Sequence, residues 1–144
     1  MKKIILLLII AFALNSCSME DRNPKVSYEL MPIKSCRMPY FFVSGETYEL
    51  EMFYIEPSTC HIYKGIYFEK QGNTRTVAIQ ATVIESSSCV TNPVDSTGTN
   101  SEFEKSVKFN FTATGNEAYF FKFWTGKNQQ GEDTYYEVEV PVEN

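Results

Sequence analysis

Residues 103–113 read Phe-Glu-Lys-Ser-Val-Lys-Phe-Asn-Phe-Thr-Ala, and this stretch decides the fold class. One face of the extended chain carries the apolar side chains of Phe103, Val107, Phe109, Phe111 and Ala113. Lys105 is the one polar residue on that face. The other face is polar throughout. Because the side chains of a β-strand point alternately to its two faces, the stretch predicts a strand with one face in the core.

The same period of two residues recurs along most of the chain. It predicts further strands at residues 26–30, 48–54, 62–68, 77–84, 118–125 and 136–142. In the last of them, Tyr136, Val138, Val140 and Val142 are expected to face inward. No segment has a helical pattern. Short, closely spaced strands predict an all-β fold, an immunoglobulin-like antiparallel β-sandwich of about seven strands that forms a single domain over residues 26–144. A closed barrel is the alternative.

A short apolar segment opens the chain. Two lysines precede an apolar run over residues 4–14, which is too short for the roughly 20 apolar residues that span a bilayer. This order is typical of a signal peptide. The run ends in Leu14-Asn15-Ser16-Cys17, which resembles the lipobox of bacterial lipoproteins. The resemblance implies a lipoprotein signal peptide over residues 1–16 and a diacylglycerol on Cys17. An ordinary signal peptide is the alternative.

The residues behind Cys17 suggest where the protein is displayed. The sequence Ser18-Met19-Glu20-Asp21-Arg22 places acidic residues directly after that cysteine. This arrangement resembles the surface-export signal of Bacteroidetes lipoproteins. It implies an outer-membrane protein, more often at the cell surface than facing the periplasm, with a lipidated tether over residues 17–25. Each buried methylene contributes about 0.8 kcal/mol, so two or three acyl chains would hold the protein on its membrane.

The charge balance excludes one class of partner. Removal of the first 16 of 144 residues would leave 128, with 11 basic and 18 acidic side chains and a net charge of −7. An acidic domain without a basic stripe has no electrostatic surface for nucleic acid. It is also not attracted to anionic lipid head groups, so the acyl chains alone would anchor it.

Three cysteines remain after lipidation of Cys17. Export places Cys36, Cys60 and Cys89 in an oxidising compartment, and their odd number allows one disulfide or none. The segments between Cys60 and Cys89 have the pattern of a hairpin, which would bring these two cysteines together. The sequence therefore favours a Cys60–Cys89 disulfide, with Cys36 as a buried thiol.

Catalytic and metal-binding constellations are weak in this sequence. His61 is the one histidine, and on a strand it would point away from its neighbour Cys60, so the two could not form a nucleophile–base pair. Cys36, Cys60, His61 and Cys89 have the ligand types of a zinc site but lack its usual spacing. The loop acids lack the calcium-binding pattern. We therefore expect no enzyme activity, no catalytic residue, no metal and no cofactor.

Two features could carry recognition. Alternation places Tyr119, Phe121 and Phe123 on one strand face and Phe120 and Trp124 on the other, which fits a strand buried on both sides or, if one face is open, a contact platform. The glutamates at alternate positions of the strands are expected on solvated outer faces, with Lys108 as a cross-strand partner. Asp95-Ser96-Thr97 matches the loose Bacteroidetes O-glycosylation pattern, which makes Ser96 a candidate glycan site.

Three phrases carry a family resemblance: Tyr54-Ile55-Glu56-Pro57-Ser58-Thr59-Cys60-His61, Asn73-Thr74-Arg75-Thr76-Val77-Ala78 and Phe121-Lys122-Phe123-Trp124-Thr125-Gly126-Lys127. With the ending at Val138–Val142, they are similar to small, uncharacterised lipoproteins of flavobacteria and other Bacteroidetes. The resemblance implies the envelope compartment, a β fold and paired cysteines at Cys60 and Cys89, and it implies no activity.

These patterns together predict a membrane-anchored envelope lipoprotein that acts as a non-enzymatic binding or structural module. Its partner would be an envelope protein or a glycan, contacted through the loops at residues 86–101 and 126–133, besides the membrane that holds its lipid. The alternative is a secreted enzyme of unrecognised type on the same β-sandwich, because sites can assemble from distant strands.

Overall fold

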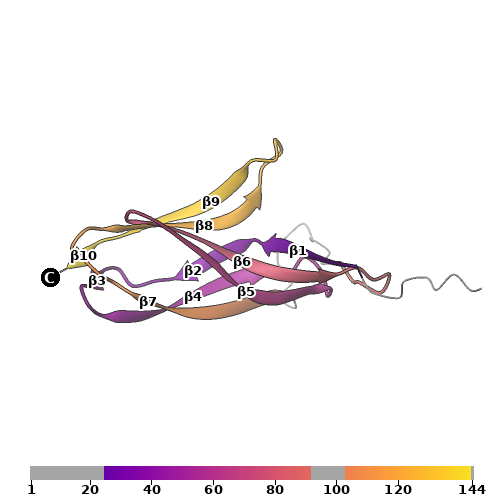
Figure 1. The fold of residues 1–144 in the computed structure, drawn as a ribbon, viewed down its shortest axis with the longest axis horizontal. Coiled ribbons are helices and arrows are strands. Elements are labelled where there is room, and N and C mark those ends of the chain that lie inside the picture. The colour runs from indigo at the N-terminus through magenta and orange to yellow at the C-terminus, as the bar shows by residue number, and fades with distance from the viewer. Residues whose placement is uncertain (1–24, 92–102, 144) are drawn as a thin grey trace, which may run out of the picture.

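The fold was analysed in a computed structural model, which describes residues 25–91 and 103–143. These residues form strands and contain no helix (Figure 1). The ten strands are β1 (Val26–Met31), β2 (Ile33–Arg37), β3 (Phe42–Val43), β4 (Thr47–Ile55), β5 (His61–Gln71), β6 (Thr74–Ile84), β7 (Glu104–Thr112), β8 (Tyr119–Lys127), β9 (Asp133–Val140) and β10 (Val142–Glu143). The predicted all-β fold is confirmed, and its separate sheets are consistent with a β-sandwich.

The larger sheet is built around β6. The hairpin partner β5 pairs antiparallel along one edge of β6. The other edge is shared, because β1 pairs with Ile79–Ile84 and β8 pairs in parallel with Thr74–Val77. Strand β9 completes this five-stranded sheet on the far side of β8.

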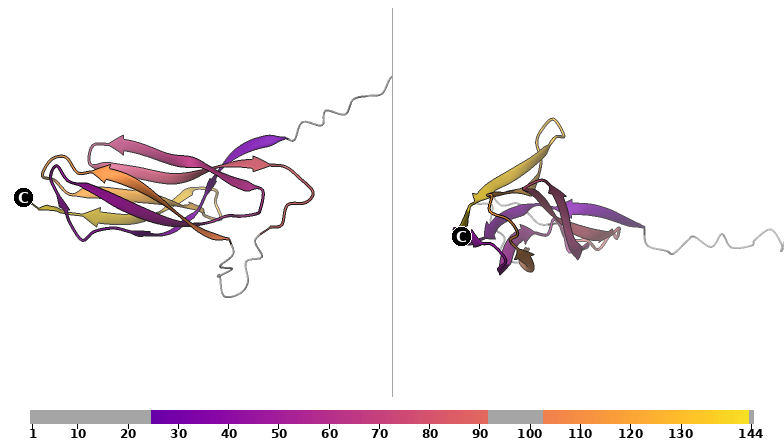
Figure 2. Two further views of the ribbon diagram at one scale, coloured as in Figure 1. Left: turned by 90° about the horizontal axis from the view of Figure 1, so that it is seen from below. Right: turned by 60° about the vertical axis from the view of Figure 1, so that its left-hand side comes forward.

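The second sheet has the order β2-β4-β7, and both of its pairs are antiparallel. The short strands β3 and β10 form a small parallel pair. Figure 2 shows that the described chain enters at one end of the molecule with β1 and leaves at the other end with β10. A tether on β1 would therefore leave the opposite end of the domain free.

The core lies between the sheets and is aromatic at one end. Five aromatic rings form a cluster there, with neighbouring ring centroids 4.9–6.4 Å apart. They belong to Phe42 on β3, Tyr48 on β4, Phe111 on β7, and Tyr119 and Phe121 on β8. Aliphatic side chains from both sheets extend it: Met31, Ile33, Leu50, Met52, Val77, Ile79 and Val140. Most of these positions obey the alternation in the sequence, and one continuous core joins the two sheets. Met31 is the exception, because the alternating apolar residues of β1, Val26, Tyr28 and Leu30, are exposed.

Two parts of the fold prediction are wrong. We expected about seven strands, all antiparallel, whereas the described residues contain ten strands, and two pairs, β6–β8 and β3–β10, are parallel. Pro32 ends β1 and the chain continues as β2 in the other sheet. Pro141 separates β9 from β10 in the same way. Proline has no N–H to donate, so a ladder breaks there and the chain can change sheets.

The inward row predicted for the last strand is also only partly correct. Val140 is buried and Val138 and Val142 are half-buried, but Tyr136 is 47% exposed. Tyr136 is paired with the buried Phe123, so its side chain lies on the core side of the sheet. Strand β9 forms the sheet edge, however, and Figure 1 shows the β8–β9 hairpin diverging from the other strands toward its tip. The core therefore does not reach this position.

Several predicted features lie outside the described residues. They are the signal peptide over residues 1–16, Cys17 and the tether up to residue 24, and Ser96 in the loop after β6. Within residues 25–91 and 103–143 there is no helix that is long and apolar enough to cross a membrane.

Candidate functional site

A cleft of about 470 Å³ opens between the two sheets, where β5 and β6 face β7. It is lined by Ile66, Phe68, Lys70, Arg75, Phe109, Asn110, Phe111, Thr112 and Thr114, and we call it the inter-sheet cleft. The rings of Phe68 and Phe109 meet across it, with centroids 6.0 Å apart. Strands β5 and β7 are edge strands of their sheets, so no other strand of the described chain closes this side of the sandwich. The cleft is therefore an apolar opening into the core.

Arg75 is the unusual residue of the inter-sheet cleft. It is only 7% exposed, and Ser58 is the one other polar residue that is buried in the described part of the chain. Its Nη1 donates to the carbonyl oxygens of Gly72 at 2.7 Å and Thr74 at 2.9 Å. Its Nε is buried and has no hydrogen-bond partner. Among the described residues no carboxylate lies within ion-pair distance of the guanidinium.

Aromatic rings fix the position of this guanidinium. The Arg75 Cζ atom lies 4.8 Å from the ring centroid of Tyr119 and 6.0 Å from that of Phe111. A cation over an aromatic face is attracted by the negative face of the ring. Together with the two bonds to the turn between β5 and β6, these rings hold Arg75 in one orientation.

Tyr119 connects Arg75 to the turn before β8. Its hydroxyl donates to the carbonyl oxygen of Thr114 and accepts from the Thr114 N–H at 2.8 Å. Burial alone would raise the pKa of this hydroxyl, but its bonds to Thr114 and the nearby charge of Arg75 lower the pKa below its ordinary value. The turn, Tyr119 and Arg75 thus form one hydrogen-bonded and stacked unit at the wall of the cleft.

The electrostatics of the inter-sheet cleft are opposite to those of the whole protein. Lys70 is the cross-strand partner of Arg75 and also lines the cleft, while none of the described lining residues is acidic. The full chain carries a net charge of −5. A local cationic, apolar opening in an acidic protein is a feature of this site and not of the surface in general.

Arg75 was not among the site residues predicted from the sequence. A signal was present, because Arg75 precedes Val77 and Ile79 at the two-residue spacing of a strand and so shares their inward face. A basic residue on an inward face is rare unless it is paired. The strands that surround it could not be read from the sequence.

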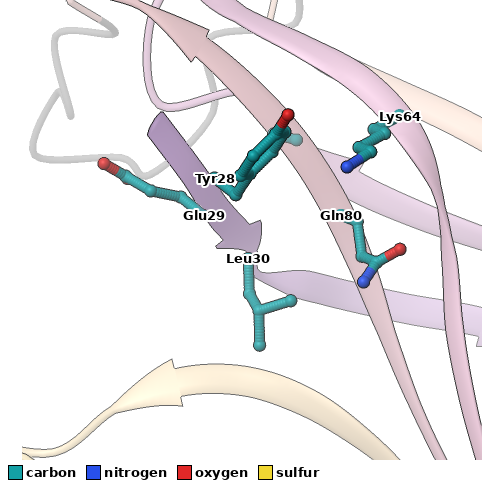
Figure 3. A pocket seen from close by; sticks show the side chains of 6 residues that line it. Tyr28, Glu29, Leu30, Lys64 and Gln80 are labelled. Atoms are coloured by element: carbon teal, nitrogen blue, oxygen red, sulfur yellow. The ribbon is translucent and has the colours of Figure 1, made fainter. Parts of the chain in front are cut away.

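A smaller hollow of about 150 Å³ lies on the outer face of the five-stranded sheet. Figure 3 shows Tyr28 and Lys64 gathered above Gln80 on β6, while Glu29 and Leu30 point away from this group. The Lys64 Nζ atom lies 3.7 Å from the centroid of the Tyr28 ring. Val26, Leu30 and Ile62 leave apolar surface exposed nearby. This hollow is a surface depression without a buried polar group, and we assign no ligand to it.

His61 is hydrogen-bonded in a way that the sequence did not indicate. Its Nδ1 lies 2.8 Å from Ser58 Oγ and its Nε2 lies 3.4 Å from Glu29 Oε2. A serine, a histidine and a carboxylate in series have the residue types of a hydrolase triad. Ser58 is only 6% exposed, however, and its Oγ also accepts from the Cys60 N–H at 3.2 Å. The arrangement therefore holds the turn before β5, and it presents no accessible nucleophile.

No protein-family model, curated protein or solved structure matches the chain. The functional assignment therefore depends on the arrangement of its own side chains. Of the sites described above, only the inter-sheet cleft combines an opening of ligand size with a buried polar group that lacks a partner.

The predicted disulfide between Cys60 and Cys89 is present in the structure, with the two Cα atoms 5.5 Å apart. It joins the start of β5 to the segment after β6. Cys60 and Cys89 are two of the four residues considered as zinc ligands, and as a disulfide they have no thiolate to offer a metal. No group of three or more metal-ligating side chains occurs within residues 25–91 and 103–143.

Cys36 is the free cysteine of the described chain and is half-buried on β2. Burial raises the pKa of its thiol to about 11. At pH 8 such a thiol holds about 100-fold less thiolate than one with the ordinary pKa, and the thiolate is the reactive form. We expect the native protein to react with a disulfide reagent at least about tenfold more slowly than the protein in urea. Equal reaction rates for the native protein and the protein in urea would contradict the half-buried position of Cys36.

Three of the glutamates on alternate strand positions form cross-strand pairs. The predicted solvated surroundings apply to Glu49 and Glu137, whereas the side chain of Glu51 is only 14% exposed. Lys108 contacts Glu49 at 2.7 Å, Arg37 contacts Glu51 at 2.7 Å and Lys122 contacts Glu137 at 3.1 Å. The proposed aromatic platform is mostly absent, because Tyr119, Phe121, Phe123 and Trp124 are buried. Phe120 alone of this group is exposed, at 46%.

Trp124 offers a probe of acid stability. Its Nε1 donates to Asp133 Oδ1 at 2.9 Å, and Lys127 lies 2.8 Å from the same oxygen. The bonds from Lys127 and Trp124 lower the pKa of Asp133 below its ordinary value of 3.8. Because the pKa of Asp133 is lowered in the folded state, its carboxylate keeps these bonds at any pH above its ordinary pKa. The bonds are lost only as the pH falls through the lower, folded-state pKa.

We therefore expect the fluorescence of Trp124, the single tryptophan, to stay constant from pH 7 down to pH 3.8 and to change only in more acidic solution. An Asp133→Asn variant has no carboxylate to titrate and should lose this transition, while circular dichroism checks that the fold persists. The same transition in the variant would assign it to another group.

Proposed function

We propose that this protein is a Bacteroidetes-type lipoprotein, anchored in the outer membrane by acyl chains on Cys17 and displayed at the cell surface, whose β domain is a non-enzymatic binding module. The lipobox-like sequence and the acidic residues behind Cys17 support the anchor and its location. The inter-sheet cleft supports the binding role. Ligand pockets typically enclose about 300–1,000 Å³ and combine an apolar lining with a few polar groups.

The single observation that carries the binding role is Arg75 at the wall of this cleft. Removing a charge from water is costly, and among the described residues Arg75 has two carbonyl acceptors but no carboxylate to offset that cost. A ligand anion would supply the missing partner. Within residues 25–91 and 103–143, the one hydrogen-bonded serine–histidine pair, Ser58 and His61, has its serine buried, so it offers no accessible nucleophile. We therefore prefer a binding module over an enzyme.

We further propose that the sandwich is related to the immunoglobulin fold. The Tyr119 hydroxyl, at the start of β8, bonds back to Thr114 just after β7. This arrangement resembles the tyrosine corner of immunoglobulin-like domains, which also sits where the chain passes between the two sheets. The parallel β6–β8 pair differs from the antiparallel sheets of that fold, so the relation concerns the corner and the two-sheet architecture.

The anchor is tested by expressing the full chain in a bacterium fed with an alkyne analogue of palmitate. We expect the wild type to carry the label and to sediment with membranes, and a Cys17→Ser variant to lose the label. Protease treatment of intact cells then distinguishes the two faces, because only a surface protein is degraded. An unlabelled wild type would contradict the anchor, and a protected but labelled protein would contradict surface display.

The binding role is tested by native mass spectrometry of the full chain purified from its membranes. We expect a small molecule to remain bound to the wild type and to be lost from an Ile66→Glu variant, because Ile66 lines the cleft. Ile62→Glu is the matched control, since Ile62 lies on the same strand but is exposed on the outer face of the sheet. Equal retention by both variants would place the ligand elsewhere.

A further inference from the structure

We propose that the ligand of the inter-sheet cleft is a small amphipathic anion, whose charged group binds Arg75 and whose apolar body packs against Ile66, Phe68 and Phe109. This inference rests on the proposed function and names the chemical class of its ligand. Four properties of the cleft lead to it: an uncompensated buried charge, an unpaired donor, a fixed guanidinium and an apolar lining.

The charge of Arg75 sets the sign of the ligand. Arginine stays protonated at every physiological pH, so the site always holds a cation. Removal of a cation from water is costly unless an anion compensates it, and the described residues provide none. Lys70, its neighbour across the β5–β6 ladder, adds a second positive charge at the same cleft. A neutral or cationic ligand would leave both charges without an anionic partner.

The hydrogen bonds of Arg75 show which part of the guanidinium remains for a ligand. Both bonds to the turn come from Nη1, which directs that nitrogen at Gly72 and Thr74. Nε has no partner and is too buried for bulk water to supply one. A carboxylate or phosphate oxygen that enters from the cleft, with a small shift of the neighbouring side chains, would accept from this N–H. Charged acceptors form the stronger hydrogen bonds of this kind.

The site is prepared for binding before any ligand arrives. The rings of Tyr119 and Phe111 and the turn carbonyls already hold the guanidinium, so little side-chain freedom is lost on binding. Ile66, Phe68 and Phe109 offer apolar surface for the remainder of the molecule. A purely inorganic anion would leave this surface uncovered, and for that reason we infer an amphipathic ligand.

The experiment titrates three matched probes into the full chain in phosphatidylcholine nanodiscs, with the isoleucine methyl groups labelled for NMR. The probes are 3-phenylpropionate, 3-phenylpropan-1-ol and 3-phenylpropylammonium, which share one apolar body and differ in charge. We expect the anion to shift the Ile66 methyl signal saturably while the signal of Ile33, a core residue on β2 at the far edge of the other sheet, stays in place. The alcohol should bind at least about tenfold more weakly and the ammonium probe should not bind.

Two variants separate binding from folding. Arg75→Lys keeps a positive charge but removes Nε and the planar group, and should weaken the anion at least about fivefold. Because this variant also loses the turn contacts, Lys70→Gln provides a second test at the exposed side of the cleft and should weaken the anion about two- to fivefold. Lys64→Gln, on the outer face beside Tyr28, is the matched control and should leave binding unchanged.

Three results would overturn the inference in different ways. Equal affinity for the alcohol and the anion would refute the anionic class, while the cleft would remain a binding site. Equal weakening by Lys64→Gln and Lys70→Gln would assign the effect to the net charge of the protein. If no probe shifts the Ile66 methyl signal, the cleft does not bind ligands of this size and the proposed binding role fails with it.

Discussion

Replacement of Phe121 by alanine is expected to lower the free energy of unfolding by about 3–5 kcal/mol, the usual cost of removing a buried aromatic side chain. Phe121 has no exposed surface. Its ring contacts those of Phe111 at 5.2 Å, Phe123 at 5.8 Å and Phe42 at 6.1 Å between centroids. These neighbours come from β7, β8 and β3, so the collapse of one strand could not fill the cavity that the alanine leaves.

The measurement is urea unfolding of the two proteins followed by circular dichroism. Phe120→Ala is the matched control, because Phe120 is the adjacent residue of the same type on the same strand but is 46% exposed. We expect the control to cost less than about 1.5 kcal/mol, in proportion to the apolar area that it buries. Similar costs for the two variants would mean that β8 does not have the inward and outward faces described above.

The second large effect is expected from the disulfide. A Cys60→Ala, Cys89→Ala double variant should lose roughly 3–4 kcal/mol, because a bridge that spans 29 residues restricts the unfolded chain. The bridge lies at the open end of the β5–β6 hairpin, next to the backbone bonds from Ile84 to Cys60 and from Thr59 to Val90. We expect this end of the domain to become the first part to open when the bridge is absent.

Hydrogen exchange and urea unfolding together test this expectation. The double variant should unfold at lower urea and should exchange the amide of Ile84 faster, while amides in the aromatic end of the core keep their protection. Cys36→Ala is the control for loss of a cysteine and should cost less than about 1.5 kcal/mol, since it removes one half-buried sulfur and no cross-link. Unchanged stability of the double variant would show that the hairpin ladder alone closes this loop.

The alternation of side chains was sufficient to predict most of the strands. Phe111 on β7, Ala113 directly after it, and Leu50 and Met52 on β4 are buried as the sequence indicates. Burial of every second residue is a local property of an extended chain, so it needs no knowledge of the neighbouring strands. The disulfide was predictable for a related reason, because the segments between its cysteines form one hairpin.

Sheet assignment was not predictable in the same way. Pro32 transfers the chain from one sheet to the other, and β2, the strand that follows it, was not predicted from the sequence. The pairing of β6 with both β1 and β8 along one edge joins residues that are 48–58 positions apart for β1 and 46 positions apart for β8. Alternation does not specify which strand lies beside which, so the parallel pair and the strand count were missed.

The sequence by itself determined the β class, the two faces of most strands and the disulfide, because each depends on residues within one strand or one hairpin. Only the tertiary structure decided the candidate site. Arg75 meets Gly72 within its own hairpin, but the rings of Phe111 and Tyr119 reach it from β7 and β8, and the cleft exists because β5 and β7 are both edge strands. The surroundings of a buried charge decide whether it can bind a ligand, and those surroundings are set by packing between segments far apart in the chain.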